Sequence, residues 1–326
     1  MDKMIIMKRL CGQGMALLEG KVDYTVVDHD DTSKCVELLR DADALLVKMA
    51  CVSAETIETC PRLRVIGRHG VGFDSVDVKA AAKRGIPVVI TPGANKRSVA
   101  EHTLAIILAL TKNLVESDQE TRAGNWEVRH YNKSFEFEGS TIGFLGLGNI
   151  GGELAKMCQG IGMKIAAYDP FVADRKMEDL DYVPYHDTDA LLRDCDIVSV
   201  HVPLNDETRG MIGWRELNLM KPSALLVNCA RGGIVSESDL ARALREHVIA
   251  GAGLDVFEGE IPKADGELLS APNLICTPHM AANTQKAEQQ ICSMMVEGVL
   301  AVLEGKRWPY VADRGVYDHP VWRDRP

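Results

Sequence analysis

The sequence predicts an α/β protein made of two doubly wound parallel sheets, each with helices on both faces. Short apolar runs alternate with longer amphipathic stretches along the whole chain, as in strands joined by crossover helices. Most runs are continuously apolar instead of alternating in polarity, which is expected of strands covered on both faces. The expected strands are residues 24–27, 44–47, 65–67 and 88–90, followed by 141–145, 164–168, 197–200, 224–228, 251–255 and 274–276.

The chain is expected to form two domains, one of them discontinuous. Its 326 residues exceed the usual size of a single small domain. A densely apolar helix is predicted over 98–114, between the two sets of strands, with Ser98 as its cap and Glu101 three residues on. A second helical pattern over 284–303 is long enough to return to the first domain. We therefore expect segments 1–97, 98–285 and 286–326, the first and last forming one domain.

The stretch 116–139 is polar but contains Trp126, Tyr131 and Phe135, and it is expected to form an extended arm. Trp and Tyr are enriched in protein interfaces, so aromatics in such a segment favour contact with a partner subunit. The alternative is that they pack onto their own domain.

Composition excludes several classes of protein. Hydrophobic residues make up 46% and charged residues 26%, as in ordinary globular chains, which disfavours disordered and fibrous classes. A net charge of −10 without any basic run disfavours a nucleic-acid partner, since such binding needs clustered Lys and Arg. No apolar stretch has secretory or membrane-spanning length, so a cytoplasmic protein without a membrane partner is expected. The nine cysteines form no C-x-x-C pair, which favours reduced thiols over disulfides or a metal site.

A glycine-rich turn of the form G-x-G-x-x-G follows the expected strand 141–145 and precedes a helical pattern. Gly146 permits a tight turn, Gly148 lets the backbone approach a pyrophosphate, and Gly151 allows close packing of helix on strand. The next strand ends in Asp169, about twenty residues on, where a carboxylate can accept both ribose hydroxyls. The pattern predicts a Rossmann domain that binds NAD.

Asp169 favours NAD over NADP, because its charge would repel a 2′-phosphate and no Arg directly follows it. Arg175 and Lys176, further along the chain, leave NADP open as an alternative. A glycine-rich turn without any ligand is the less favoured interpretation.

Three later strands are followed by residues suited to hydride transfer. The reduction of a 2-oxo acid needs a cation for the carboxylate, an acid for the developing alkoxide, and a group that holds that acid. Arg231, Glu260 and His279 each follow a predicted strand, and the carboxyl ends of parallel strands meet at one edge of the sheet. Histidine titrates near neutrality, and a neighbouring carboxylate favours its charged form. Taken singly, the non-functional explanation is favoured for each: Arg231 as a surface charge, Glu260 as a solvated loop residue, and His279 as a residue that approaches a helix after Pro278.

In combination these motifs resemble the D-isomer-specific 2-hydroxyacid dehydrogenases, the family of D-3-phosphoglycerate dehydrogenase, glyoxylate/hydroxypyruvate reductase and D-lactate dehydrogenase. The likeness extends over nearly the whole chain. Its ordered matches are residues 67–77, 91–105, 143–151, 201–213, 228–240, 252–262 and 277–284.

The resemblance implies NAD-dependent interconversion of a D-2-hydroxy acid and its 2-oxo acid, with Arg231, Glu260 and His279 at the family's catalytic positions. It also implies a Rossmann domain inserted in a flavodoxin-like substrate domain, and a homodimer formed through the NAD domain. Glu260 stands where formate dehydrogenases of this family carry Gln, which disfavours formate. Besides the three glycines, the positions expected to contact the cofactor are Asn149, Ile150, Asp169, Val202, Pro203, Cys229, Ala230 and Asp255.

The resemblance also implies that a small anionic substrate meets the main chain of Gly70, Val71 and Gly72 and an early loop containing Lys48. Relatives often have an Arg-Ser-x-Thr run in that loop, whereas this chain has Lys48 and Ala50 there, which disfavours 3-phosphoglycerate. Lys48 still offers a point charge to an anion. The particular hydroxy acid stays open.

The main alternative function is an NAD(H)-sensing protein without metabolic turnover, similar to the corepressors that resemble the same family. No low-complexity extension suited to a scaffold is present, which favours the enzyme. A metal-dependent dehydrogenase is disfavoured because no spaced group of His and carboxylates occurs.

Overall fold

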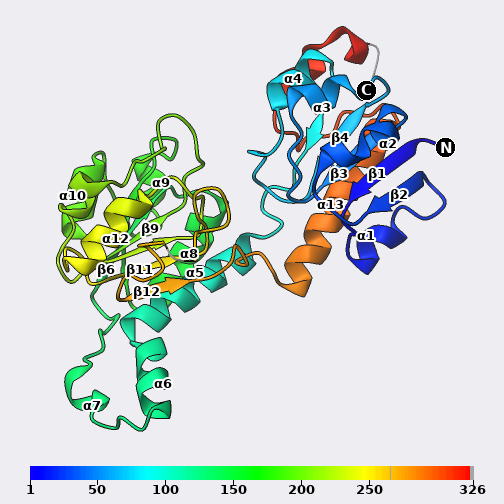
Figure 1. The fold of residues 1–326 in the computed structure, drawn as a ribbon. Coiled ribbons are helices and arrows are strands. Elements are labelled where there is room, and N and C mark those ends of the chain that lie inside the picture. Colours follow the sequence, from blue (N-terminus) through cyan, green and yellow to red (C-terminus); the bar gives the residue numbers. More distant parts are fainter. Residues whose placement is uncertain (265, 324–326) are drawn as a thin grey trace. The chain divides into compact units, whose positions relative to one another are not determined.

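The computed structural model describes residues 1–264 and 266–323, which fold into two compact units (Figure 1). Unit 1 consists of Met1–Asn95 and Thr284–Pro326, and unit 2 of Lys96–Asn283. The expected boundaries, after residues 97 and 285, each lie two residues beyond those of the structure. Both units contain an all-parallel sheet with flanking helices, so the predicted α/β class is confirmed.

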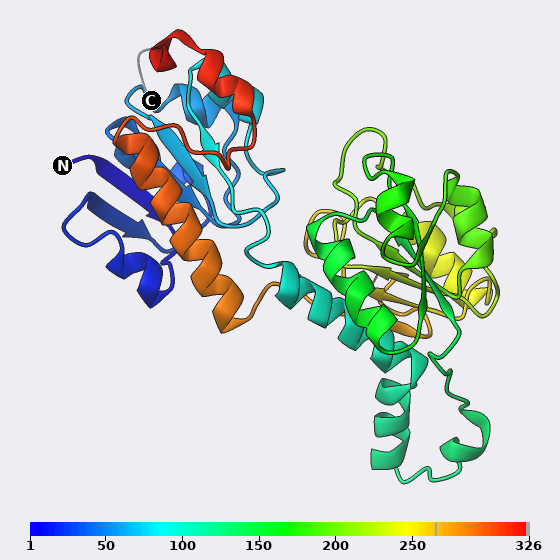
Figure 2. The ribbon, with the colours of Figure 1, turned by 180° about the vertical axis from the view of Figure 1, so that it is seen from behind.

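Unit 1 contains a five-stranded sheet in the order β2-β1-β3-β4-β5. Its strands are β1 (Lys3–Met7), β2 (Asp23–Val27), β3 (Ala44–Val47), β4 (Val65–Arg68) and β5 (Val88–Val89). The helices are α1 (Gly12–Ala16), α2 (Val36–Arg40), α3 (Ala54–Glu58), α4 (Val78–Lys83) and α13 (Gln285–Leu303), with 3-10 turns η1 (Thr32–Cys35), η2 (Arg314–Asp318) and η3 (Pro320–Trp322). Helices α1 and α13 cover one face of the sheet, and α2, α3 and α4 cover the other (Figure 2).

The sequence interpretation missed β1, which pairs with both β2 and β3. The apolar run is short and stands between Lys3 and Lys8, so it gives little local indication of a strand.

The segment that follows α13 also packs on this unit. Val311 pairs antiparallel with Val89, and the buried Trp322 donates a hydrogen bond from Nε1 to the carbonyl of Gly85 at 2.8 Å.

Unit 2 contains a seven-stranded parallel sheet in the order β12-β11-β10-β9-β6-β7-β8. Its strands are β6 (Thr141–Leu145), β7 (Lys164–Tyr168), β8 (Tyr182–Pro184), β9 (Ile197–Val200), β10 (Leu225–Asn228), β11 (Gly251–Leu254) and β12 (Leu274–Cys276). The helices are α5 (Lys96–Thr111), α6 (Leu114–Arg122), α7 (Val128–Tyr131), α8 (Asn149–Gly160), α9 (Asp174–Glu178), α10 (Thr188–Asp194), α11 (Trp214–Leu217) and α12 (Glu237–Arg245). The strand order reverses between β6 and β9, where ligands of doubly wound sheets bind.

Two opposite layers cover this sheet. Helices α5 and α8 pack on one face, and α10, α11 and α12 pack on the other. The edge strand β8 was not expected from the sequence; it is three residues long, ends in Pro184, and exposes Val183.

The predictions for 98–114 and 116–139 need correction. Helix α5 begins at Lys96, before Ser98, whose hydroxyl does not cap it but donates to the carbonyl of Ala281 at 2.7 Å. The stretch expected to form an extended arm does project from the rest of unit 2, but it does so as the helices α6 and α7 and not as extended chain (Figures 1 and 2). Phe135 packs onto its own unit, whereas Trp126 and Tyr131 are exposed.

Among the described residues, no single helix is long and apolar enough to cross a membrane. The pair α5 and α6, bent by 57°, passes that test by length and composition alone, and half of the α5 residues are buried.

Candidate functional site

The residues expected to bind a cofactor or act in catalysis follow six parallel strands of unit 2 and therefore lie at one edge of its sheet. Gly146 follows β6, and Asp169 follows β7. Val202 and Pro203 follow β9, and Cys229, Ala230 and Arg231 follow β10. Asp255 and Glu260 follow β11, and His279 follows β12.

The structure requires glycine at two of the three glycine positions of the turn. Gly146 has a φ of +95°, and a Cβ there would lie 2.8 Å from the carbonyl oxygen of His201. A Cβ on Gly151 would lie 2.4 Å from the carbonyl oxygen of Gly146, so a side chain would push α8 away from the turn. A Cβ on Gly148 would meet nothing within 4 Å. Gly148 is therefore not needed for the fold, and its missing side chain leaves open space at the start of α8.

This open space adjoins a helix N-terminus. Helix α8 starts at Asn149, Gly148 precedes it, and no side chain caps it. The first N–H groups of a helix have no partner within the helix, and with the helix dipole they favour an anion. Main-chain N–H groups and free space for a phosphate thus occur together, and the residues fit a dinucleotide pyrophosphate.

Asp169 holds the same turn from the neighbouring strand. Its Oδ2 accepts the N–H of Leu147 at 2.7 Å, and its Oδ1 accepts the N–H of Phe171 at 2.9 Å. The carboxylate is only partly buried, and each oxygen keeps a lone pair for a ribose hydroxyl. The chain's own residues therefore fix Asp169 in an orientation that suits an adenosine ribose.

Glu260 and His279 are brought together. Nδ1 of His279 lies 2.7 Å from Oε2 of Glu260, and the two side chains are 34% and 49% exposed. A carboxylate only accepts, so Nδ1 carries the hydrogen of this bond. Nε2 is then the nitrogen that can exchange a proton with a ligand.

Both residues have left-handed backbones, with φ of +71° at Glu260 and +49° at His279. Such a conformation costs an ordinary L-residue about 1 kcal/mol or more, and it persists only where the surroundings enforce it. The neighbouring peptides must therefore be held by other contacts.

Asp255 supplies much of this restraint. Its side chain is buried, and its Oδ1 accepts the hydroxyl of Thr277 at 2.6 Å and the N–H of Met280 at 2.9 Å. Its Oδ2 accepts the N–H of Ala281 at 2.9 Å. Asp255 thus fastens the segment on both sides of His279, a role that the sequence did not indicate; its contact with a cofactor stays a prediction.

The turn that carries Arg231 is held by Asn228, another residue whose role the sequence did not indicate. The buried Asn228 side chain donates from Nδ2 to the carbonyl of Arg231 at 2.8 Å and accepts the N–H of Ala230 at 2.9 Å. A Cβ on Gly232 would lie 2.0 Å from the carbonyl oxygen of Phe257, so the turn lies directly against the loop that leads to Glu260. The partly buried Arg231 also donates from Nη1 to the carbonyl of Ala230 at 2.7 Å.

Two groups at or next to these positions, the buried Cys229 and the partly buried His201, are uncharged at neutral pH. Burial raises the pKa of the Cys229 thiol to about 12, so this cysteine is no nucleophile. Burial lowers the pKa of His201 to about 4; its ring stacks on Phe144, and its Nε2 lies 2.8 Å from the hydroxyl of Ser199.

The residues expected to bind substrate lie at the corresponding edge of the sheet of unit 1. Lys48 follows β3, and its Nζ lies 3.5 Å from a carboxylate oxygen of Glu288 on α13. The residues 70–72 follow β4; Gly70 has a φ of +136° and accepts the N–H of Thr91 at 3.0 Å. Within unit 1, Lys48 is thus already paired with an anionic group.

The fold and the glycine turn place the chain among the doubly wound dinucleotide-binding proteins. The family described as "D-isomer specific 2-hydroxyacid dehydrogenase, NAD binding domain" matches residues 104–281. The chain belongs to the D-isomer specific 2-hydroxyacid dehydrogenase family.

Curated relatives agree with this assignment. The chain is 37% identical over 307 residues to D-3-phosphoglycerate dehydrogenase of Methanocaldococcus jannaschii, covering 94% of this chain and 58% of the relative. It is 38% identical over 315 residues to glyoxylate reductase of Thermofilum pendens, covering 93% and 92%. The chain thus spans little more than half the length of the phosphoglycerate enzyme.

Solved structures share the fold. The TT0316 protein of Thermus thermophilus is 30% identical, with a TM-score of 0.87 over 95% of this chain and all of the other. D-Lactate dehydrogenase of Aquifex aeolicus, solved with NAD and lactic acid, is 30% identical, with a TM-score of 0.84 over 93% and 96%. The glyoxylate/hydroxypyruvate reductase of Sinorhizobium meliloti, solved with NADP and malonate, is 27% identical, with a TM-score of 0.86 over 97% of each chain.

Proposed function

We propose that this chain is an NAD-dependent D-2-hydroxyacid dehydrogenase that uses His279 as its acid/base. The observation that carries the proposal is the 2.7 Å contact between Nδ1 of His279 and Glu260, at the same sheet edge as the glycine turn. An oriented imidazole beside a dinucleotide site is what carbonyl reduction requires.

The cofactor is held by the turn 146–151 and Asp169. The N–H groups at the start of α8 would hold the pyrophosphate in the space that Gly148 leaves, and Asp169 would hold the ribose hydroxyls. The other positions proposed to contact the cofactor are Asn149, Ile150, Val202, Pro203, Cys229, Ala230 and Asp255. When bound, the nicotinamide supplies or accepts the hydride.

The protein residues then act on the 2-oxo acid. Arg231 binds the carboxylate and the carbonyl oxygen through its planar guanidinium. His279 would donate a proton from Nε2 to the carbonyl oxygen of the 2-oxo acid during reduction, and would take the proton back in the reverse reaction. Glu260 orients the ring and stabilises the imidazolium form. The proton on Nδ1 stays with His279 throughout.

Lys48 and the main chain of Gly70, Val71 and Gly72 are proposed to contact the substrate's carboxylate or a second polar group. This assigns unit 1 as the substrate domain, of flavodoxin-like architecture, and unit 2 as the NAD domain. The substrate is a small anionic 2-oxo or 2-hydroxy acid. The nine free thiols suit a reducing compartment, and we propose the cytoplasm.

We also propose a homodimer formed through α6 and α7. Helix α6 has no buried residue, and Leu114 and Val115 are exposed on it. Trp126 is 62% and Tyr131 58% exposed in the same projecting segment. Aromatic side chains at this exposure are typical of interface anchors. A Trp126→Ser, Tyr131→Ser variant is expected to be monomeric in sedimentation velocity; an unchanged dimer, or a monomeric unmodified chain, would contradict the assignment.

The reaction is tested by following NADH oxidation with a panel of 2-oxo acids: glyoxylate, hydroxypyruvate, pyruvate, 2-oxoglutarate and 3-phosphohydroxypyruvate. At least one is expected to be reduced to the D-hydroxy acid, with NADH preferred over NADPH because of Asp169. Tight NADH binding without oxidation by any acid would support the sensing protein instead. Production of the L-isomer would overturn the stereochemical assignment.

A further inference from the structure

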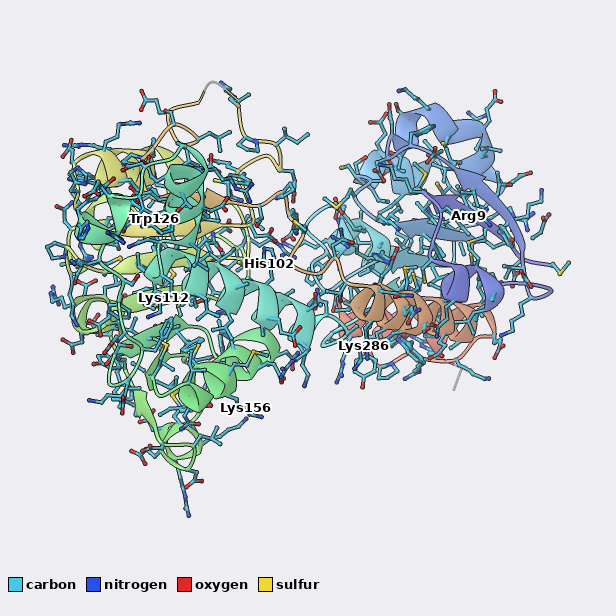
Figure 3. The ribbon with its side chains drawn as sticks, turned by 90° about the horizontal axis from the view of Figure 1, so that it is seen from below. Arg9, His102, Lys112, Trp126, Lys156 and Lys286 are labelled. Carbon is cyan, nitrogen blue, oxygen red and sulfur yellow. The ribbon has the colours of Figure 1, made fainter. Side chains whose placement is uncertain are left out.

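Helix α5 touches the segment that carries His279 at two places. Nε2 of His102 lies 3.0 Å from the hydroxyl oxygen of Thr277 and 3.5 Å from Oδ1 of Asp255. The hydroxyl of Ser98 donates to the carbonyl of Ala281 at 2.7 Å. The two contacts stand on either side of His279, and His102 is labelled on α5 in Figure 3.

The direction of the His102 contact follows from hydrogen counting. The hydroxyl of Thr277 has one hydrogen, which it gives to Oδ1 of Asp255 at 2.6 Å. Its oxygen can then only accept from His102, so Nε2 of His102 carries a hydrogen. A neutral amide N–H in the same place would serve equally well.

Ser98 completes a set of contacts around Ala281. The N–H of Ala281 is bound by Asp255 and its carbonyl by Ser98, both within the buried interior. A buried carbonyl without a donor is costly, so the Ser98 contact fixes this peptide.

Helix α5 is a rigid support for these contacts. A Cβ on Gly253 would lie 2.1 Å from Cγ2 of Ile106, so α5 packs directly on the backbone of β11. The segment it restrains follows β12, an edge strand paired only with β11. Restraint from α5 therefore replaces what a second neighbouring strand would give.

We propose that His102 and Ser98 are positioning residues that hold the segment 277–281, and with it the left-handed backbone of His279, in the conformation that meets Glu260. The effect of this restraint on catalysis rests on the function proposed above. The restraint itself belongs to the chain without ligands.

The experiment compares His102→Leu with His102→Gln, and uses Glu101→Gln as the control, since Glu101 is an exposed neighbour on the same helix. Hydrogen exchange of a peptide covering 277–283 is measured by mass spectrometry without cofactor, and kcat and the KM for NADH by steady-state assay. We expect His102→Leu to exchange faster in this peptide and to lose about tenfold in kcat, since small misplacements of a reacting group have effects of this order. The KM for NADH and the hydrogen exchange of α8 should stay unchanged. His102→Gln should restore both the slow exchange of the 277–283 peptide and the kcat of the unmodified chain.

Wild-type exchange in His102→Leu, or a loss that His102→Gln does not restore, would overturn the proposal. A second test combines His102→Leu with Thr277→Val. Both substitutions remove the same contact, between His102 and Thr277. The double variant should therefore lose no more activity than the more damaging single variant. Additive losses would show independent roles. If the unmodified chain reduces no 2-oxo acid, the proposed function fails, and the exchange data alone still decide whether His102 restrains the segment.

Discussion

In unit 2 the candidate functional residues follow six of the seven strands, whereas in unit 1 they follow only β3 and β4. Both units are parallel sheets with helices on both faces, so the architecture does not separate them. Unit 2 alone has the turn in which Gly146 and Gly151 meet backbone and Gly148 meets open space. The fold thus supplies an edge where loops converge, and the residues of the loops decide the chemistry.

Substitution of His279 is expected to lower the activity most. His279→Ala should lower kcat by at least about a thousandfold, since an acid/base acts in the transition state, and leave the Kd of NADH within about twofold. Steady-state assays and NADH fluorescence titration measure the two quantities. His186→Ala, at an exposed histidine of the same unit, is the matched control. Full activity of His279→Ala would contradict the acid/base role of His279.

The glycine turn gives the next largest effect, and it separates binding from folding. Gly148→Val should fold with an unchanged Tm, because its side chain enters open space, but should raise the Kd of NADH by at least about tenfold because that space receives the pyrophosphate. Gly151→Ala should lower the Tm instead, because its Cβ would clash with Gly146. Scanning calorimetry measures the two Tm values, and titration calorimetry measures the Kd of NADH. Tight NADH binding by Gly148→Val would contradict the proposed cradle.

Each unit has a partly buried histidine directly after a strand, His69 after β4 and His201 after β9. Burial lowers the pKa of each to about 4, with the charges of Lys48 and Arg68 adding to the effect at His69. A histidine of the unfolded chain takes up its proton at a higher pH than the same histidine in the folded chain. The stability that each neutral ring contributes is therefore complete above pH about 6.5 and is lost as the pH falls toward 4. Each histidine should lower the free energy of unfolding by about 2 kcal/mol between pH 7 and 5.

Urea unfolding at both pH values checks this expectation, with His69→Gln and His201→Gln losing less stability on acidification than the unmodified chain. His186→Gln serves as the control for an exposed ring. Equal pH dependence in all variants would show that neither ring is responsible.

The smallest effect is expected at Lys48. Lys48→Met should raise the KM of the 2-oxo acid by about fivefold with little change in kcat, because a partly exposed point charge paired with Glu288 adds modest binding energy. Lys79→Met, at another lysine of unit 1, should behave as the unmodified chain. An unchanged KM would leave the main chain of 70–72 as the substrate contact of unit 1.

Much of the fold could be predicted because its strands are continuously apolar and their connections are helical. The two strands that the sequence did not predict, β1 and β8, are short runs bounded by lysines or by Pro184, and only pairing with neighbours makes them strands. The cap assigned to Ser98 failed for a similar reason. Its hydroxyl binds Ala281, a residue 183 positions away, in preference to the start of its own helix.

The parallel α/β class, the glycine turn with Asp169, and the placement of Arg231, Glu260 and His279 after strands could all be predicted from the sequence. These depend on side-chain periodicity and on steric limits that act within a few residues. Three features became visible only in the folded chain: Glu260 meets His279, both of their backbones are left-handed, and Asp255, Asn228 and helix α5 hold the loops. Such contacts join residues far apart in the chain, and their geometry exists only after the strands have aligned in one sheet.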